Sequence, residues 1–270
     1  MESQDRSGIP ELTGGAPLYR QPEPLNPIDH GSLGLLQGGV PFAFAAGSHF
    51  VPLLISEFVA ASGSYPVIFA GDEKAPLAVM GLKKGGNLFV PDAMGRGEVY
   101  IPAYLRRYPF VVAASSIEGE NSAVICIDRA ADMVGENPAK PFYENGLPTE
   151  YTNNCISFCQ AYENERLMTI QFVDRLKELD LFDFRTAKYT PTPEMGLGTE
   201  QVEVAGYYAI DSEKLNDLPV ETYIQLRDQG VLSAIFAHWA SQLQWDRIVA
   251  RSLRREFEAS LVNNPMPANG

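Results

Sequence analysis

The sequence predicts an α+β fold, with a mainly antiparallel sheet packed against long C-terminal helices. Short apolar segments separated by turn residues fill the first half of the chain, whereas helix-length apolar patterns dominate after residue 155. Strands joined by tight turns pair antiparallel, and helices that follow them in a separate block are typical of α+β proteins. With 45% hydrophobic and 20% charged residues, the 270-residue chain has the composition of a globular protein.

The first segment, residues 1–41, is rich in proline and glycine, which remove backbone donors and add chain entropy. We therefore expect an extended arm without regular structure. Two alternatives remain open for it: its leucines dock the arm on the domain or on a partner, or it is a partly disordered tail. Residues 42–260 are predicted to form a single α+β domain, and residues 261–270 a frayed tail.

The first half of the domain is expected to hold one short helix and several strands. Pro52 suits the first turn of a helix, and Gly85-Gly86 permits the positive φ of a tight hairpin. Continuous apolar runs bounded by turn signals are typical of buried strands. The expected elements are a helix at 51–61 and strands at 65–70, 77–82, 87–90, 110–114 and 123–127.

The second half is expected to hold the long helices. Asn154 suits the N-cap of a helix at 155–179, and Gly230 would end a helix that begins at Pro219. A continuous apolar stripe predicts one more helix over residues 231–257. Prolines and glycines predict a loop at 183–200, which a strand at 202–210 follows.

The net charge of −13 limits the partners that we expect. Nucleic acid and anionic lipid both attract basic surfaces, so neither is a predicted partner. No apolar run reaches the roughly 18 residues of a membrane span, and the N-terminal residues lack the pattern of a secretory signal as they stand. We expect a cytoplasmic protein; another export route would be needed for surface association.

Three cysteines are too few for a disulfide scaffold. Cys155 and Cys159 would share a helix face, but a metal site there would need two further ligands. The chain has only three histidines to supply them. We therefore expect reduced, packed thiols, no metal and no cofactor.

The segment Gly95–Ser116 concentrates aromatic and cationic side chains. The segment around Arg106 and Arg107 is short and ends at Pro109, so their backbone is expected to be held between a turn and a buried strand. Their guanidinium groups are then expected to diverge, one toward the protein and one toward a groove or solvent. Two alternatives remain open. The arginines bind a carboxylate or phosphate, or one of them pairs with an acid such as Glu98 or Glu118 while the other is solvated.

Other candidate side chains have similar alternatives. Tyr100, Tyr104 and Tyr108 recur every four residues and would share a helix face, either as packing residues or as a ligand platform. His238 suits acid–base chemistry because it titrates near neutral pH, but Trp239 would take the core stripe and leave His238 at its border. The candidate ligand-binding residues are Arg106, Arg107, Tyr104, Tyr108, His238 and Trp239.

Catalytic residues are not identified. Glu118 and Glu120 are close enough in sequence to act as a carboxylate pair, but exposure in a glycine-containing turn is the alternative. No nucleophile elbow, HExxH, Walker or Rossmann pattern occurs. The sequence therefore leaves open whether the chain is an enzyme.

Several segments resemble the bacterial SapC family, which is distinct from the membrane permease of the same name. The most specific is YIPAYLRRYPF, residues 100–110. Further matching stretches lie at 51–58, 65–69, 81–90, 142–149 and 232–243.

The resemblance implies a non-catalytic protein that acts through a protein partner, through self-association or in a surface-layer assembly, because the family is linked to bacterial paracrystalline surface layers. The resemblance implies a second, alternative role. In this alternative, the protein is a ligand-binding accessory or an enzyme that works beside a flavin-dependent halogenase or a TonB-dependent uptake system.

Overall fold

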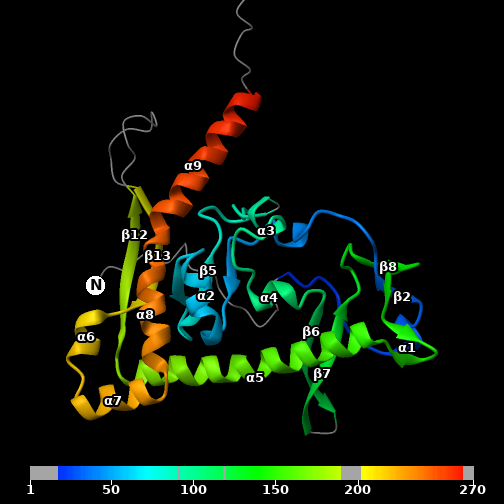
Figure 1. Ribbon diagram of the computed structural model, residues 1–270, viewed down its shortest axis with the longest axis horizontal. Helices are drawn as coiled ribbons and strands as arrows, with labels where there is room; N and C mark the ends of the chain where they lie inside the picture. Colours follow the sequence, from blue (N-terminus) through cyan, green and yellow to red (C-terminus); the bar gives the residue numbers. More distant parts are fainter. Residues whose placement is uncertain (1–17, 91, 118–119, 190–201, 264–270) are drawn as a thin grey trace, which may run out of the picture.

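The computed structural model describes residues 18–90, 92–117, 120–189 and 202–263, and it confirms the α+β fold (Figure 1). The larger sheet has five antiparallel strands in the order β12-β13-β4-β5-β3. These strands are β3 (Phe50–Pro52), β4 (Val67–Ala70), β5 (Ala75–Val79), β12 (Phe182–Tyr189) and β13 (Val202–Ile210).

Smaller antiparallel groups of strands lie at the other end of the molecule (Figure 1). The hairpin of β6 (Phe110–Ile117) and β7 (Glu120–Asp128) is extended by β1 (Pro22–Pro24). A second group has the order β8-β2-β9, and β10 pairs with β11. Their bounds are β2 (Leu33–Leu35), β8 (Val134–Glu136), β9 (Lys140–Pro141), β10 (Tyr143–Glu144) and β11 (Leu147–Pro148).

Helix α5 (Glu150–Glu178) runs along the length of the molecule and joins the two ends (Figure 1). Helix α8 packs on α2 and on the larger sheet. The remaining helices are α1 (Pro27–His30), η1 (Ala43–Ala45), η2 (Ile55–Glu57), α2 (Phe58–Ser62), α3 (Asp92–Gly95), α4 (Ala103–Arg106), α6 (Ser212–Asn216), α7 (Val220–Asp228), α8 (Val231–Ser241) and α9 (Gln244–Asn263).

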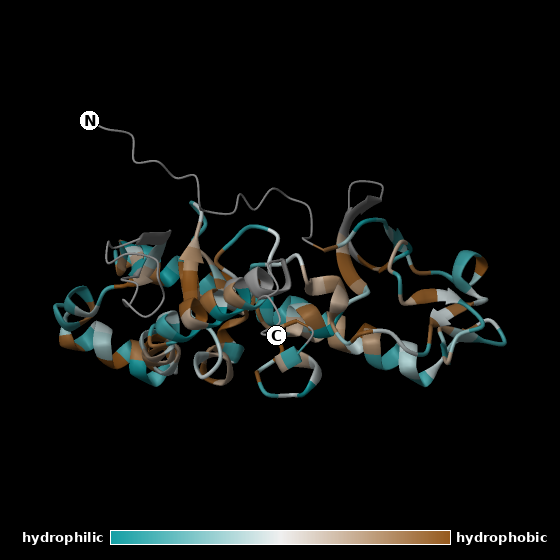
Figure 2. Cartoon of the chain, turned by 90° about the horizontal axis from the view of Figure 1, so that it is seen from above, coloured by the Kyte–Doolittle hydropathy of each residue, from teal (hydrophilic) through white to brown (hydrophobic). Residues whose placement is uncertain are grey.

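The buried apolar side chains form two clusters. The larger lies between the five-stranded sheet and its helices, and the smaller lies among the strands at the other end. Helix α5 contributes Phe172 and Leu176 to the larger cluster and Cys159 to the smaller. In Figure 2 the brown, hydrophobic stretches lie mostly on strands, and the teal, hydrophilic ones lie mostly on helices and loops.

The N-terminal segment departs from the expected irregular arm. Residues 22–35 contain β1, α1 and β2, and Leu33 is only 2% exposed in the smaller cluster. The prolines fit these elements because β1 is an edge strand and Pro27 occupies the first turn of α1. Residues 1–17 lie outside the described part, and the boundary at residue 42 stays a prediction.

Two expected elements of the first half are wrong. The helix at 51–61 is instead β3, η2 and α2, because Phe50–Pro52 pairs with β5. Residues 87–90 do not form a strand, although the Leu88 amide donates to the Met80 carbonyl over 2.8 Å. The intervening turn does use a positive φ, at Gly85.

Three expected elements of the second half also differ. Helix α5 begins five residues early, with Thr149 as its N-cap. Residues 183–189 form β12 rather than loop because they pair with β13; residues 190–200 lie outside the described part. The expected helix at 231–257 is divided into α8 and α9 at Gln242-Leu243. Residues 261–263 still belong to α9, and residues 264–270 of the expected frayed tail are not described.

Candidate functional site

Helix α4 lies at the junction between the two apolar clusters. Tyr104 belongs to the larger cluster, and Tyr108, just after the helix, belongs to the smaller. The helix has four residues, and the amides of Arg106 and Arg107 donate to Pro102 and Ala103 at its start. The position of α4 therefore places both arginines where the clusters meet.

The guanidinium group of Arg107 is buried. Arg107 is 6% exposed, and its Nη1 lies 3.4 Å from Glu163 Oε1 on α5. The group lies 4.1 Å from the centre of the Tyr162 ring, 4.7 Å from that of Tyr104 and 5.7 Å from that of Tyr19. Aromatic faces stabilise a desolvated cation. Arg107 Nε has no hydrogen-bond partner among the described residues.

Arg106 points to the surface, and its side chain is 45% exposed. Its guanidinium group lies 5.2 Å from the centre of the Phe158 ring and 3.9 Å from Glu57 Oε1. The two guanidinium groups thus diverge as expected. Their acidic neighbours are Glu57 and Glu163; Glu98 pairs with Arg96 instead, at 2.5 Å. Glu118 and the side chain of Glu120 lie outside the described part of the chain.

Glu57 is a buried carboxylate that the sequence analysis missed. It accepts hydrogen bonds from the amide of Leu54 (2.9 Å), the hydroxyl of Tyr100 (2.8 Å) and the amide of Ala103 (2.6 Å). These bonds attach the start of α4 to the η2 segment. The single charged residue of the mostly apolar stretch 53–61 was the available signal, because a buried acid needs hydrogen-bond donors.

Tyr104 and Tyr108 are buried. Burial raises the pKa of Tyr104 to about 12, so its hydroxyl is neutral. Tyr108 stacks on Phe44, with ring centres 4.2 Å apart, and donates a hydrogen bond to Asp128 over 3.1 Å. Tyr100 and Tyr108 lie outside the four-residue α4, so the three tyrosines do not share one helix face.

His238 and Trp239 occupy the reverse of their expected positions. His238 is fully buried, and Trp239 is partly buried and donates from Nε1 to the Ile210 carbonyl over 2.8 Å. His238 Nε2 accepts from the Ile210 amide over 3.2 Å, and burial lowers the pKa of the ring to about 4. Neither residue lines the pockets beside the arginines, so the structure does not bring His238 to Arg106 and Arg107.

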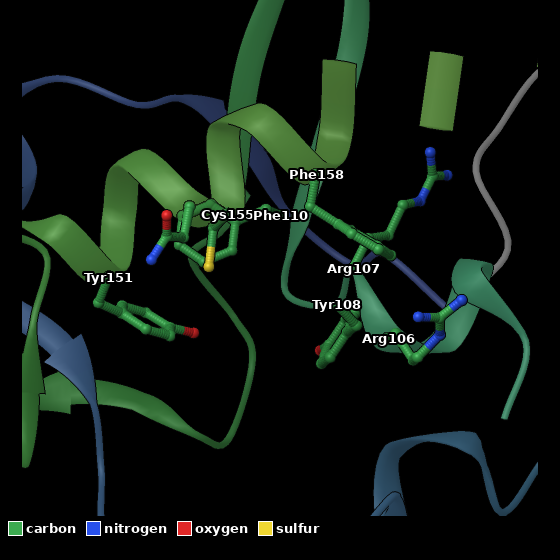
Figure 3. A pocket seen from close by; sticks show the side chains of 8 residues that line it. Arg106, Arg107, Tyr108, Phe110, Tyr151, Cys155 and Phe158 are labelled. Atoms are coloured by element: carbon green, nitrogen blue, oxygen red, sulfur yellow. The ribbon is translucent and has the colours of Figure 1, made fainter. Parts of the chain in front are cut away.

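A pocket of about 190 Å³ lies on one side of Arg107, between α4, β6 and the start of α5. Figure 3 shows Tyr151 and Cys155 on one side of it and the two guanidinium groups away from them. Burial is the main cause that raises the pKa of the Cys155 thiol. A protonated thiol is a poor nucleophile, so this pocket does not present an activated cysteine.

A larger pocket of about 360 Å³ lies on the other side of Arg107. One wall is a single face of α5, and the other is formed by β3 with the β4–β5 hairpin. Tyr104 and Arg107 close the end near α4. The lining from α5 is Tyr162, Arg166, Thr169, Ile170, Val173 and Asp174. Arg107 therefore lines both pockets.

Among the described residues, no three His, Cys, Asp or Glu side chains gather in a way that would hold a metal ion. No described helix has the length and apolar character needed to cross a membrane.

Comparison with known proteins gives one match. A family model described as SapC matches residues 25–248, which include both pockets and nearly all of the described sheet strands. No curated protein and no solved structure matches the chain.

Proposed function

The chain belongs to the SapC family, and from this premise we propose that it is a non-catalytic protein that binds a small ligand in its larger pocket. One observation carries the proposal: Arg107, a buried cation, lines a 360 Å³ pocket whose walls are largely apolar. Binding pockets are typically about 300–1,000 Å³, with apolar walls and a few convergent polar groups. A buried charge is costly to retain, and a recognition role gives a reason to keep it.

Neither His238 nor Cys155 offers an activated catalytic group beside the arginines, which favours binding over catalysis. His238 lines neither pocket, and burial keeps its ring neutral near pH 7. The thiol of Cys155 is protonated because burial raises its pKa. The role that the family resemblance implies, an accessory beside an uptake receptor or a halogenase, suits a protein that holds a small ligand.

Filling the pocket tests the proposal. Ile170 lines the pocket and is 43% exposed, so Ile170→Trp would block the space without disturbing the buried core. Leu167→Trp is the matched control, because Leu167 is an exposed residue of the same helix outside the pocket lining. Small-molecule binding is measured by ligand-observed NMR with a fragment library.

We expect fragments that bind the wild type and Leu167→Trp to lose binding to Ile170→Trp, while thermal unfolding stays the same for all three. Equal binding to all three proteins, or no binding to the wild type, would overturn the proposal.

A second candidate function, self-association, has its own observation in its favour. Phe236, Trp239 and Leu243 follow one another at spacings of three and four residues, and Leu243 is 76% exposed. A stripe of partly exposed apolar side chains at helical spacing is a candidate contact face. Self-association through this face would provide the contacts of a surface-layer-type assembly.

Sedimentation equilibrium tests this second candidate. Leu243→Glu is expected to shift the protein toward monomer, because a charge on this face opposes burial. Leu147→Glu is the control, since Leu147 is as exposed but lies at β11. A monomeric wild type, or equal masses for the wild type and both variants, would exclude the candidate.

A further inference from the structure

We infer that the ligand of the larger pocket is an elongated amphipathic carboxylate, with its head group at Arg107 and Arg166 and its apolar body along α5. This inference rests on the proposed function of the pocket and names its ligand class. It follows from three features of the lining: a cationic end, an apolar middle and an acidic far end.

The cationic end has more positive than negative charge. Arg107 and Arg166 both contact the carboxylate of Glu163, at 3.4 and 2.6 Å, so two guanidinium groups share one acid. Nε of Arg107 has no hydrogen-bond partner within the described ranges. Arg166 lines the pocket with a side chain that is 47% exposed, so its guanidinium group can bind a second carboxylate by charge-assisted hydrogen bonds beside the buried charge of Arg107. This local excess of positive charge contrasts with the net charge of −13 of the whole chain.

The middle of the pocket is apolar. Leu53 and Leu54 face Ile170 and Val173 of α5 across it. The α5 residues that line the pocket, from Tyr162 to Asp174, span about 18 Å at the rise of an α-helix. An extended hydrocarbon body fits this length, and it would bury the exposed part of Ile170.

The far end is acidic and sets the direction of the ligand. Glu73 and Asp174 line the pocket there, and both contact Lys177, at 3.6 and 3.4 Å. Two carboxylates face one ammonium group, so a carboxylate ligand would be repelled from this end. The head group therefore lies at the arginine end.

Isothermal titration with three probes of equal chain length tests the ligand class. The probes are decanoate, decanol and decyltrimethylammonium, each used below the concentration at which it forms micelles. We expect decanoate to bind about tenfold more tightly than decanol, the ratio that one charge-assisted hydrogen bond contributes. Decyltrimethylammonium is expected to bind most weakly.

The outcomes separate the ligand class from the pocket's function. Equal affinity for decanoate and decanol, or tighter binding of decyltrimethylammonium, would overturn the carboxylate class while leaving the pocket a binding site. If none of the three probes binds and the fragment library also fails, the proposed function falls as well. If fragments bind but no probe does, only the amphipathic class is overturned.

A substitution at the cationic end locates the head group without removing buried Arg107. Arg166→Gln is expected to weaken decanoate binding about tenfold and leave decanol unchanged. Arg175→Gln is the control, because Arg175 is an α5 arginine that pairs with Glu178 and does not line the pocket. Unchanged decanoate affinity in Arg166→Gln would overturn the placement of the head group.

Discussion

The guanidinium group of Arg107 lies 4.1 Å from the centre of the Tyr162 ring. This contact joins the end of the short helix α4 to the long helix α5. Glu163, the next residue of α5, contacts the same guanidinium group. The contacts bring a residue of the most specific family segment against α5, where Glu163 lies 56 positions later in the chain. They also place a cation between the two pockets.

We predict that Arg107→Ala lowers the free energy of unfolding by about 3 kcal/mol or more, the cost of breaking a buried charge pair. Arg106→Ala should lower it by less than about 1 kcal/mol, because the Arg106 side chain is half exposed. Urea denaturation of the two single variants measures both values. Equal and small changes would show that the buried guanidinium group does not hold α4 against α5.

We predict that Glu57→Gln lowers the free energy of unfolding by about 2 kcal/mol, since hydrogen bonds to a buried charge contribute about 1.5–3 kcal/mol. The amide can replace only part of the acceptor set for Leu54, Tyr100 and Ala103. Glu98→Gln is the control, because Glu98 is an exposed acid paired with Arg96. Equal stability of the two variants in thermal and urea unfolding would contradict the prediction.

We predict that His238 makes the protein less stable in acid. Burial lowers the pKa of its ring from 6.5 to about 4, so below pH 6.5 the unfolded chain binds a proton that the folded chain does not. The free energy of unfolding is therefore unaffected by this group above pH 6.5. It falls by about 3 kcal/mol in total as the pH falls from 6.5 toward about 4. His238→Gln should flatten the stability profile over this window in urea unfolding. An unchanged slope would exclude His238 as its cause.

We predict that Leu33→Ala lowers the free energy of unfolding by about 3 kcal/mol, because it leaves a cavity in the smaller cluster. Ile28→Ala, at a fully solvated position of α1, should change it little. The comparison also tests the boundary predicted at residue 42. If Leu33→Ala unfolds like the wild type, the N-terminal segment is an appendage; if not, it is part of the domain core.

Local signals in the sequence were sufficient to predict several helices and strands. The alternation of Val202–Ile210 predicted β13 with its observed bounds, and Pro219 with Gly230 bracketed α7. Strand β12 was missed because its residues, among them Asp183, Arg185 and Lys188, have no apolar run; they form a strand by pairing with β13. Pairing with a neighbouring strand decided this element, because strand propensity depends strongly on context.

The features of the candidate site likewise separate into those that the sequence determined and those that only the tertiary structure decided. The sequence by itself determined the fold class, the family segment around Arg106 and Arg107, and the divergence of their guanidinium groups, since these depend on neighbouring residues. Only the tertiary structure decided that Arg107 is the buried one, that Glu163 is its partner, and that His238 rather than Trp239 lies in the core. The physical reason is that burial and charge pairing depend on which faces of α4, α5 and α8 pack together, and that packing is set by contacts between residues far apart in the chain.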